Sequence, residues 1–140
     1  MWGKHLLAGL GITFKYLFKP KVTSQYPDEK IIQPDRFRGI HYLDSEKCIV
    51  CNQCVKICPT GCISLTGKPN PDPEKKGKVL DTYDINFGLC ILCDLCTEVC
   101  PTDAIQMTNN FELAVYSKEK LLKNINWLEN NNENVRRANK

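Results

Sequence analysis

One cysteine pattern, C-x2-C-x2-C-x3-C-P, occurs twice in this chain of 140 residues and constrains its fold more than any other feature. The two copies consist of Cys48, Cys51, Cys54, Cys58 and Pro59, and of Cys90, Cys93, Cys96, Cys100 and Pro101. The neighbouring residues repeat as well, because residues 48–66 and 90–108 share 9 identities in 19 aligned positions. So strict a repeat indicates one structural unit that is present in two copies.

The nine cysteines point either to disulfides in an oxidising compartment or to metal in a reducing one. Their odd number argues against a framework of disulfides alone. We expect no secretory signal, because the apolar stretch Leu6–Phe14 runs into Lys15 and Lys19 without a small-residue cleavage site. Structural zinc is a further alternative, but zinc sites pair two C-x2-C knuckles or recruit histidine. The only two histidines, His5 and His41, lie outside both cysteine runs.

The spacing instead fits two [4Fe-4S] clusters. Three cysteines at two-residue gaps wrap around one cluster, and the fourth, which precedes a proline, ligates the other cluster. We therefore predict one cluster on Cys48, Cys51, Cys54 and Cys100, and a second cluster on Cys90, Cys93, Cys96 and Cys58. Crossed ligation makes the fold and the cofactors depend on each other. Because cysteine then caps every iron, we predict outer-sphere electron transfer and no catalytic residue in this chain.

Three positions beside the ligands need their own interpretation. Cys62 aligns with Ala104, so we predict a small apolar side chain in the core; a spare ligand or a redox thiol is the alternative. Asn52 and Asp94 follow the second cysteine of each run, where small ferredoxins often have glycine. Both residue types tolerate left-handed backbone, which predicts a turn at each site. An alternative hypothesis is that an ionised Asp94 lowers the potential of its cluster.

The chain divides into four predicted regions. Residues 1–19 form an amphipathic helix, residues 20–43 an extended linker, residues 44–116 the double-cluster domain, and residues 117–140 a C-terminal helix with a polar tail. A short strand is expected at Ile40–Leu43, and a returning strand around residues 79–85. We expect the C-terminal helix to begin after Ser117 and to bury a narrow stripe of Leu121, Leu122, Ile125 and Leu128. From Asn130 the chain is Asn-rich and charged, and we expect disorder there unless a partner orders it.

The predicted N-terminal helix has two distinct faces. Its apolar stripe consists of Trp2, Leu6, Leu10, Phe14 and Phe18, and Lys4, Lys15 and Lys19 lie opposite that stripe. This pattern is typical of a helix at a membrane surface or in a partner groove, although a helix packed on its own domain is the alternative. No run of 18 or more uncharged apolar residues occurs, so no transmembrane helix is predicted.

The predicted fold class is α+β: a ferredoxin-like, pseudo-twofold double-cluster core of two short antiparallel β-pairs and two helices. The formal net charge of +3 would suggest an acidic partner. Two clusters with about −2 each would leave the loaded protein close to neutral. The basic residues are also scattered outside the two ends of the chain, so we predict no nucleic-acid partner.

The segments around the cysteines resemble the eight-iron I subunit of respiratory complex I and its relatives. The resemblance covers roughly residues 10–123. It rests on Lys19-Pro20-Lys21-Val22-Thr23, Gln25-Tyr26-Pro27, Glu29-Lys30, Arg36-Phe37-Arg38-Gly39, Tyr83-Asp84-Ile85-Asn86 and Phe111-Glu112-Leu113. All eight cysteines of the family pattern are present, so the resemblance implies eight ligands and two [4Fe-4S] clusters.

The resemblance also implies a place in a larger assembly. Such a subunit is peripheral to the membrane on its cytoplasmic side, or on the stromal or matrix equivalent, and relays electrons toward a quinone. Its partners would be the other subunits, including the quinone-site iron–sulfur subunit. The donor stays open among NADH, ferredoxin and a reduced deazaflavin. Two alternatives are an iron–sulfur subunit of a related membrane-bound hydrogenase and a free 2x[4Fe-4S] ferredoxin carrier.

Overall fold

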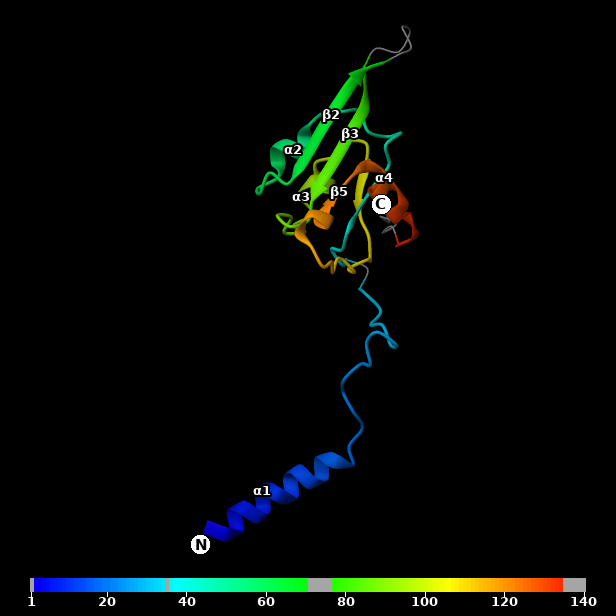
Figure 1. Cartoon of the computed structure of the whole chain (residues 1–140). Coiled ribbons are helices and arrows are strands. Elements are labelled where there is room, and N and C mark those ends of the chain that lie inside the picture. Colours follow the sequence, from blue (N-terminus) through cyan, green and yellow to red (C-terminus); the bar gives the residue numbers. More distant parts are fainter. Residues whose placement is uncertain (1, 35, 71–76, 135–140) are drawn as a thin grey trace. The chain divides into compact units, whose positions relative to one another are not determined.

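The computed structural model describes residues 2–34, 36–70 and 77–134 (Figure 1). By its internal contacts the chain divides into two units, Met1–Ile32 and Gln33–Lys140. The first unit contains one helix and an extended segment, and the second contains every cysteine.

The helix of the first unit, α1, spans Trp2–Leu17, which agrees with the expected N-terminal helix. Its apolar side chains are exposed, among them Leu6 (78%), Leu10 (66%) and Phe14 (63%). Phe14 and Phe18 pack edge to face with ring centroids 5.4 Å apart. In the part of the chain that the structure describes, no helix is long and apolar enough to cross a membrane.

The second unit is built on two antiparallel sheets and two short helices. Strand β1 (His41–Leu43) pairs with β4 (Ile105–Met107), and β2 (Ile63–Pro69) pairs with β3 (Lys78–Asn86). Figure 1 shows β2 and β3 as the long green ribbon. The helices α2 (Gln53–Ile57) and α3 (Leu95–Glu98) each follow the second cysteine of one run. The strands expected before the first run and between the two runs are therefore present.

The two strand pairs have the same register relative to the cysteine runs. The runs are displaced by 42 positions, since Cys48 corresponds to Cys90. The pairs His41↔Met107 and Leu43↔Ile105 of the first sheet become Tyr83↔Leu65 and Ile85↔Ile63 of the second after the same displacement of 42. The sequence repeat therefore extends into the strand pairing, several residues upstream of the first cysteine of each run.

The core of the second unit is small and apolar. Its fully buried side chains include those of Ile40, Leu43, Tyr83, Ile85 and Leu128. Burial of each such side chain contributes about 1.5–3 kcal/mol. The main chain at Gly39 lies so close to β4 that a Cβ atom there would overlap the carbonyl oxygen of Asn110. Glycine at this position therefore lets the chain enter β1 directly beside the end of β4.

The C-terminal region differs from the single helix expected after Ser117. The chain forms a 3₁₀ helix η1 (Lys118–Leu121), a two-residue strand β5 (Leu122–Lys123), α4 (Ile125–Asn130) and a 3₁₀ helix η2 (Asn131–Asn134). Strand β5 adds to the edge of β3, which gives the second sheet a third strand that was not expected. These ladder bonds interrupt the helix, and Asn124 restarts it by accepting a hydrogen bond from the amide of Trp127.

The predicted apolar stripe and the predicted disorder are wrong in part for the same reason. Leu128 is fully buried, but Leu122 is 59% exposed because it belongs to an edge strand. Asn131, expected in a disordered tail, donates from Nδ2 to the carbonyl oxygen of His41 at 3.1 Å. Residues 135–140 of the expected tail lie outside the described residues.

Candidate metal centre

Each cysteine run contains two left-handed residues, which lie on either side of its second cysteine. Val50 and Asn52 of the first run have φ of 56° and 60°, and Leu92 and Asp94 of the second run have 53° and 73°. The left-handed positions predicted for Asn52 and Asp94 are thus confirmed. Successive amides in such a path converge on one side and form a concave site for an anion, as they do at many iron–sulfur centres. A net negative cluster would be stabilised by such a site.

The first cavity lies against the first cysteine run. Its lining includes the first three cysteines of that run and the last cysteine of the other run: Cys48, Cys51, Cys54 and Cys100. Apolar side chains, among them Leu43, Leu65 and Ile105, complete the wall. The four cysteines that we predicted for one cluster therefore line a single cavity.

The second cavity lies against the second cysteine run. Its cysteines are Cys90, Cys93, Cys96, Cys58 and, in addition, Cys62. Thiolate sulfur is the donor that iron–sulfur clusters require, and each cavity offers four such donors in an apolar wall. In the described residues, no group of three or more His, Cys, Asp or Glu side chains converges on a single metal ion. The two sets of four cysteines supply the ligands that two [4Fe-4S] clusters would need.

The fourth cysteine of each run differs from the others in its electrostatics. Burial acts to raise the pKa of Cys58, but hydrogen bonds from Thr60 and Cys62 outweigh it and bring the pKa to about 7. Burial opposes the same change at Cys100, where hydrogen bonds from the backbone and from Thr102 lower the pKa. Because a ligand must be a thiolate, both cysteines are prepared for ligation. Burial instead raises the pKa of Cys48, Cys54, Cys90 and Cys96.

Cys62 is buried, with 6% of its surface exposed, and its counterpart Ala104 is 2% exposed. Both positions therefore accommodate only a small side chain, as the repeat alignment indicated. The Cys62 sulfur also lies 3.4 Å from that of Cys58. Burial raises the pKa of Cys62 to about 12, so this thiol keeps its proton beside the predicted ligand.

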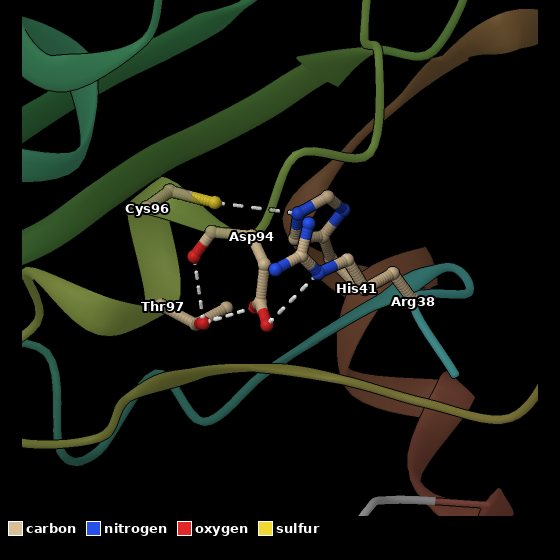
Figure 2. A network of polar contacts seen from close by, with 5 residues as sticks. All are labelled: Arg38, His41, Asp94, Cys96 and Thr97. Atoms are coloured by element: carbon tan, nitrogen blue, oxygen red, sulfur yellow. Dashed lines mark hydrogen bonds and ion pairs between the residues drawn. The ribbon is translucent and has the colours of Figure 1, made fainter. Parts of the chain in front are cut away.

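A network of polar contacts, shown in Figure 2, includes three residues that line the second cavity: His41, Asp94 and Cys96. His41 Nε2 is 3.3 Å from the sulfur of Cys96, and burial lowers the pKa of His41 to about 4, although Asp94 partly opposes this. Thr97 donates its hydroxyl to the carbonyl oxygen of Asp94 at 2.9 Å and to the Asp94 carboxylate. Arg38 Nε lies 3.8 Å from Asp94 Oδ2. The guanidinium therefore offsets part of the charge through which, in our hypothesis, Asp94 lowers the cluster potential.

Sequence reasoning did not place His41 or Tyr83 at the cavities. The Tyr83 hydroxyl donates to the sulfur of Cys54 at 3.5 Å, beside the first cavity. Both residues lie seven positions before the first cysteine of a run, outside the aligned windows 48–66 and 90–108. Extending the repeat alignment upstream would have aligned His41 with Tyr83. The two residues differ in type, so sequence identity does not reveal that their positions are equivalent.

Known proteins share both the cysteine region and much of the flanking chain. The 4Fe-4S dicluster domain family matches residues 47–104. NAD(P)H-quinone oxidoreductase subunit I of Prochlorococcus marinus is 44% identical over 120 residues, which cover 85% of this chain and 53% of that protein. The same subunit of Gloeobacter violaceus is 40% identical over 118 residues, which cover 84% and 56%. The chain thus spans about half the length of the curated relatives that it matches.

A solved structure is similar as well. It is that of the membrane-bound sulfane sulfur reductase, an archaeal respiratory membrane complex, with 35% identity and a TM-score of 0.57. The match covers 79% of this chain and 56% of the other. These matches confirm the resemblance that was inferred from the residues flanking the cysteines. The chain is therefore a homologue of subunit I of the NAD(P)H-quinone oxidoreductases and contains a ferredoxin-like 4Fe-4S dicluster domain of the α+β class.

Proposed function

We propose that this chain is the iron–sulfur electron-transfer subunit of a membrane-bound, proton-pumping complex I-like oxidoreductase. It would relay electrons through two [4Fe-4S] clusters toward a quinone or a quinone-like acceptor. The observation that carries this proposal is the pair of cavities, each lined by the four cysteines that we predicted for one cluster, which come from both runs. The names of the relatives supply the kind of complex.

The proposed ligands follow the lining of the cavities. Cys48, Cys51, Cys54 and Cys100 would hold one cluster, and Cys90, Cys93, Cys96 and Cys58 the other. Each bound cluster supplies a centre that accepts and releases one electron. The equal displacement of 42 in the runs and in the strand pairs supports a pseudo-twofold axis between the halves. Apolar side chains line much of each cavity, and the solvent exposure of a cluster is one of the factors that set its potential.

The surroundings of the proposed subunit follow from the same relatives. Its partners would be the other chains of the complex, including the quinone-site iron–sulfur subunit. We place it on the cytoplasmic side of the membrane or on the stromal or matrix equivalent. The exposed apolar side chains of α1, with lysines on the opposite face, support attachment to the membrane surface.

A second candidate function has one observation in its favour. The solved relative is a sulfane sulfur reductase, so the match at 35% identity includes a respiratory membrane complex that is named for another reaction. In that case the chain would relay electrons to a catalytic partner that does not reduce quinone. A free ferredoxin carrier is the simpler alternative, but the similarity to subunit I extends beyond the cysteine domain over 85% of the chain.

Purification of a tagged copy from solubilised membranes tests the proposed function. We expect a large set of accompanying chains, identified by mass spectrometry, that includes a quinone-site iron–sulfur subunit. The donor module among them would identify the electron donor. A catalytic partner for sulfur reduction in place of the quinone site would support the second candidate. Recovery of the chain alone from the soluble fraction would contradict both.

Membrane attachment through α1 predicts a specific effect of Leu10→Glu. Leu10 lies in the middle of the apolar stripe and is 66% exposed. Loss of its burial in lipid costs about 1.5–3 kcal/mol, so vesicle affinity should fall tenfold or more. Flotation of the iron-loaded chain with vesicles that contain anionic lipid measures this effect.

Ala8→Glu is the matched control for charge. Ala8 is also exposed and lies roughly 160° around the helix from Leu10, on the same face as the lysines. This variant should retain most of the vesicle binding. Equal loss of binding in both variants would show that charge alone governs attachment, and the apolar face of α1 would then have no role in it.

A further inference from the structure

The third cysteine of each run receives a buried polar contact from the opposite half of the domain. The Tyr83 hydroxyl donates to Cys54 Sγ at 3.5 Å, and His41 Nε2 lies 3.3 Å from Cys96 Sγ. Tyr83 and His41 are only 1% and 2% exposed. Neither contact is therefore weakened by competition with bulk water.

The two contacts are equivalent under the repeat. His41 and Tyr83 differ by 42 positions, and so do Cys54 and Cys96. The residues cross over: His41, in the strand before the first run, contacts the second run, and Tyr83, in the strand before the second run, contacts the first. The same place in the fold is thus occupied by an imidazole on one side and by a phenol on the other.

The surrounding chain fixes the orientation of His41. Its strand β1 is paired with β4, and its carbonyl oxygen accepts a hydrogen bond from Asn131. Its ring packs against that of Phe87, with centroids 5.7 Å apart. Among the described residues, the buried Nδ1 atom has no hydrogen-bond partner. A ligating thiolate can only accept a hydrogen bond, so the proton of the imidazole belongs on Nε2, facing the sulfur.

We propose that His41 and Tyr83 are hydrogen-bond donors that set the potentials of the two clusters separately, His41 through Cys96 and Tyr83 through Cys54. This inference rests on the cluster ligation that the proposed function contains. Each cluster becomes more negative when it takes up an electron, so a donor to its sulfur stabilises the reduced form more than the oxidised form. Both donors therefore raise the potential of the cluster that they contact.

The two clusters should consequently differ in potential. Beside His41, the second cavity is lined by Asp94, whose carboxylate is 3.8 Å from Arg38. In the first cavity the equivalent position is the neutral Asn52. The repeat thus holds the ligands in the same way, while the residues that contact them differ in kind and in charge.

Two single substitutions test the proposal in the iron-loaded full chain. Tyr83→Phe removes one hydroxyl, and His41→Phe removes the donor while retaining an aromatic ring. Each variant should lower the equilibrium constant for reduction of one cluster about tenfold. For a one-electron couple, this corresponds to a fall of about 59 mV in the midpoint potential. A redox titration followed by electron paramagnetic resonance should show that the two variants shift different signals. His41→Gln, which offers an amide donor, should restore part of the shift.

Iron analysis separates the two ways in which this experiment could fail. Fewer than two clusters in the unaltered chain would contradict the proposed function itself. Two clusters with unmoved midpoints, or with the same signal moved by both variants, would overturn only the role of the donors.

A measurement that leaves His41 in place covers the case in which His41→Phe fails to fold. The chain has two histidines, His5 and His41, so labelling with ¹⁵N-histidine marks few sites. Pulsed electron paramagnetic resonance should detect the ¹⁵N label coupled to only one of the two reduced clusters. This coupling should persist in His5→Gln. The absence of any such coupling would overturn the assignment of His41.

Discussion

Cys58→Ala should remove the cluster of the second run and leave the cluster of the first run in place. Cys58 lies in the first run, but it lines the cavity with Cys90, Cys93 and Cys96. The iron content should fall by roughly half, because the variant loses one of two four-iron clusters. Iron analysis and the visible absorption of the purified chain measure this loss. The protein should stay folded, since the remaining cluster still joins Cys100 to the first run.

Two comparisons make this expectation specific. Cys62→Ala is the matched control, because Cys62 lines the same cavity and its counterpart in the repeat is already alanine at position 104. Its iron content should stay at the level of the unaltered chain. Adding Cys93→Ala to Cys58→Ala should cost no further iron, whereas adding Cys51→Ala should remove both clusters. The reverse result for these double variants would show that each run ligates its own cluster.

Complete removal of iron should unfold the second unit. Its helices α2 and α3 contain five and four residues, which is far below the length at which a helix is stable alone. The cysteines of both runs line the two cavities. In structural metal sites the binding free energy is folding free energy, and the same coupling applies here.

Far-UV circular dichroism before and after chelation measures this effect. Hydrogen exchange of β1 and β4 should lose its protection together with the visible absorption. The helix α1 belongs to the other unit and serves as an internal reference, since its exchange should not change. A far-UV spectrum that is unchanged after iron removal would mean that the apolar core around Ile40 and Ile85 suffices for folding.

The sequence could predict the fold wherever short-range spacing decides it. The two cysteine runs, the strands before them and the left-handed Asn52 and Asp94 follow from local pattern and turn chemistry. The resemblance to subunit I was likewise readable from the segments that flank the runs. These features depend on residues that are close together in the chain, so a single sequence contains them.

The features that sequence analysis missed depend on long-range packing. Leu122 and Lys123 were predicted to be helical, but they form backbone hydrogen bonds with the edge of β3. No local sequence pattern indicates this pairing. The contact from His41 to Cys96 joins residues that are 55 positions apart. Nothing in the type of either residue marks the pair, and only the register of β1 against β4 brings the imidazole to the sulfur.

The crossed lining of the cavities has a consequence for biosynthesis. Three cysteines of the first cavity have been translated once the ribosome has passed Cys54. The fourth, Cys100, is translated only near the end of the domain. The second cavity likewise combines Cys58 with residues that are translated more than thirty positions later. Neither half of the nascent chain can therefore close a four-cysteine cage by itself. With the ligation that we propose, iron–sulfur delivery to this chain would follow translation of nearly the whole domain.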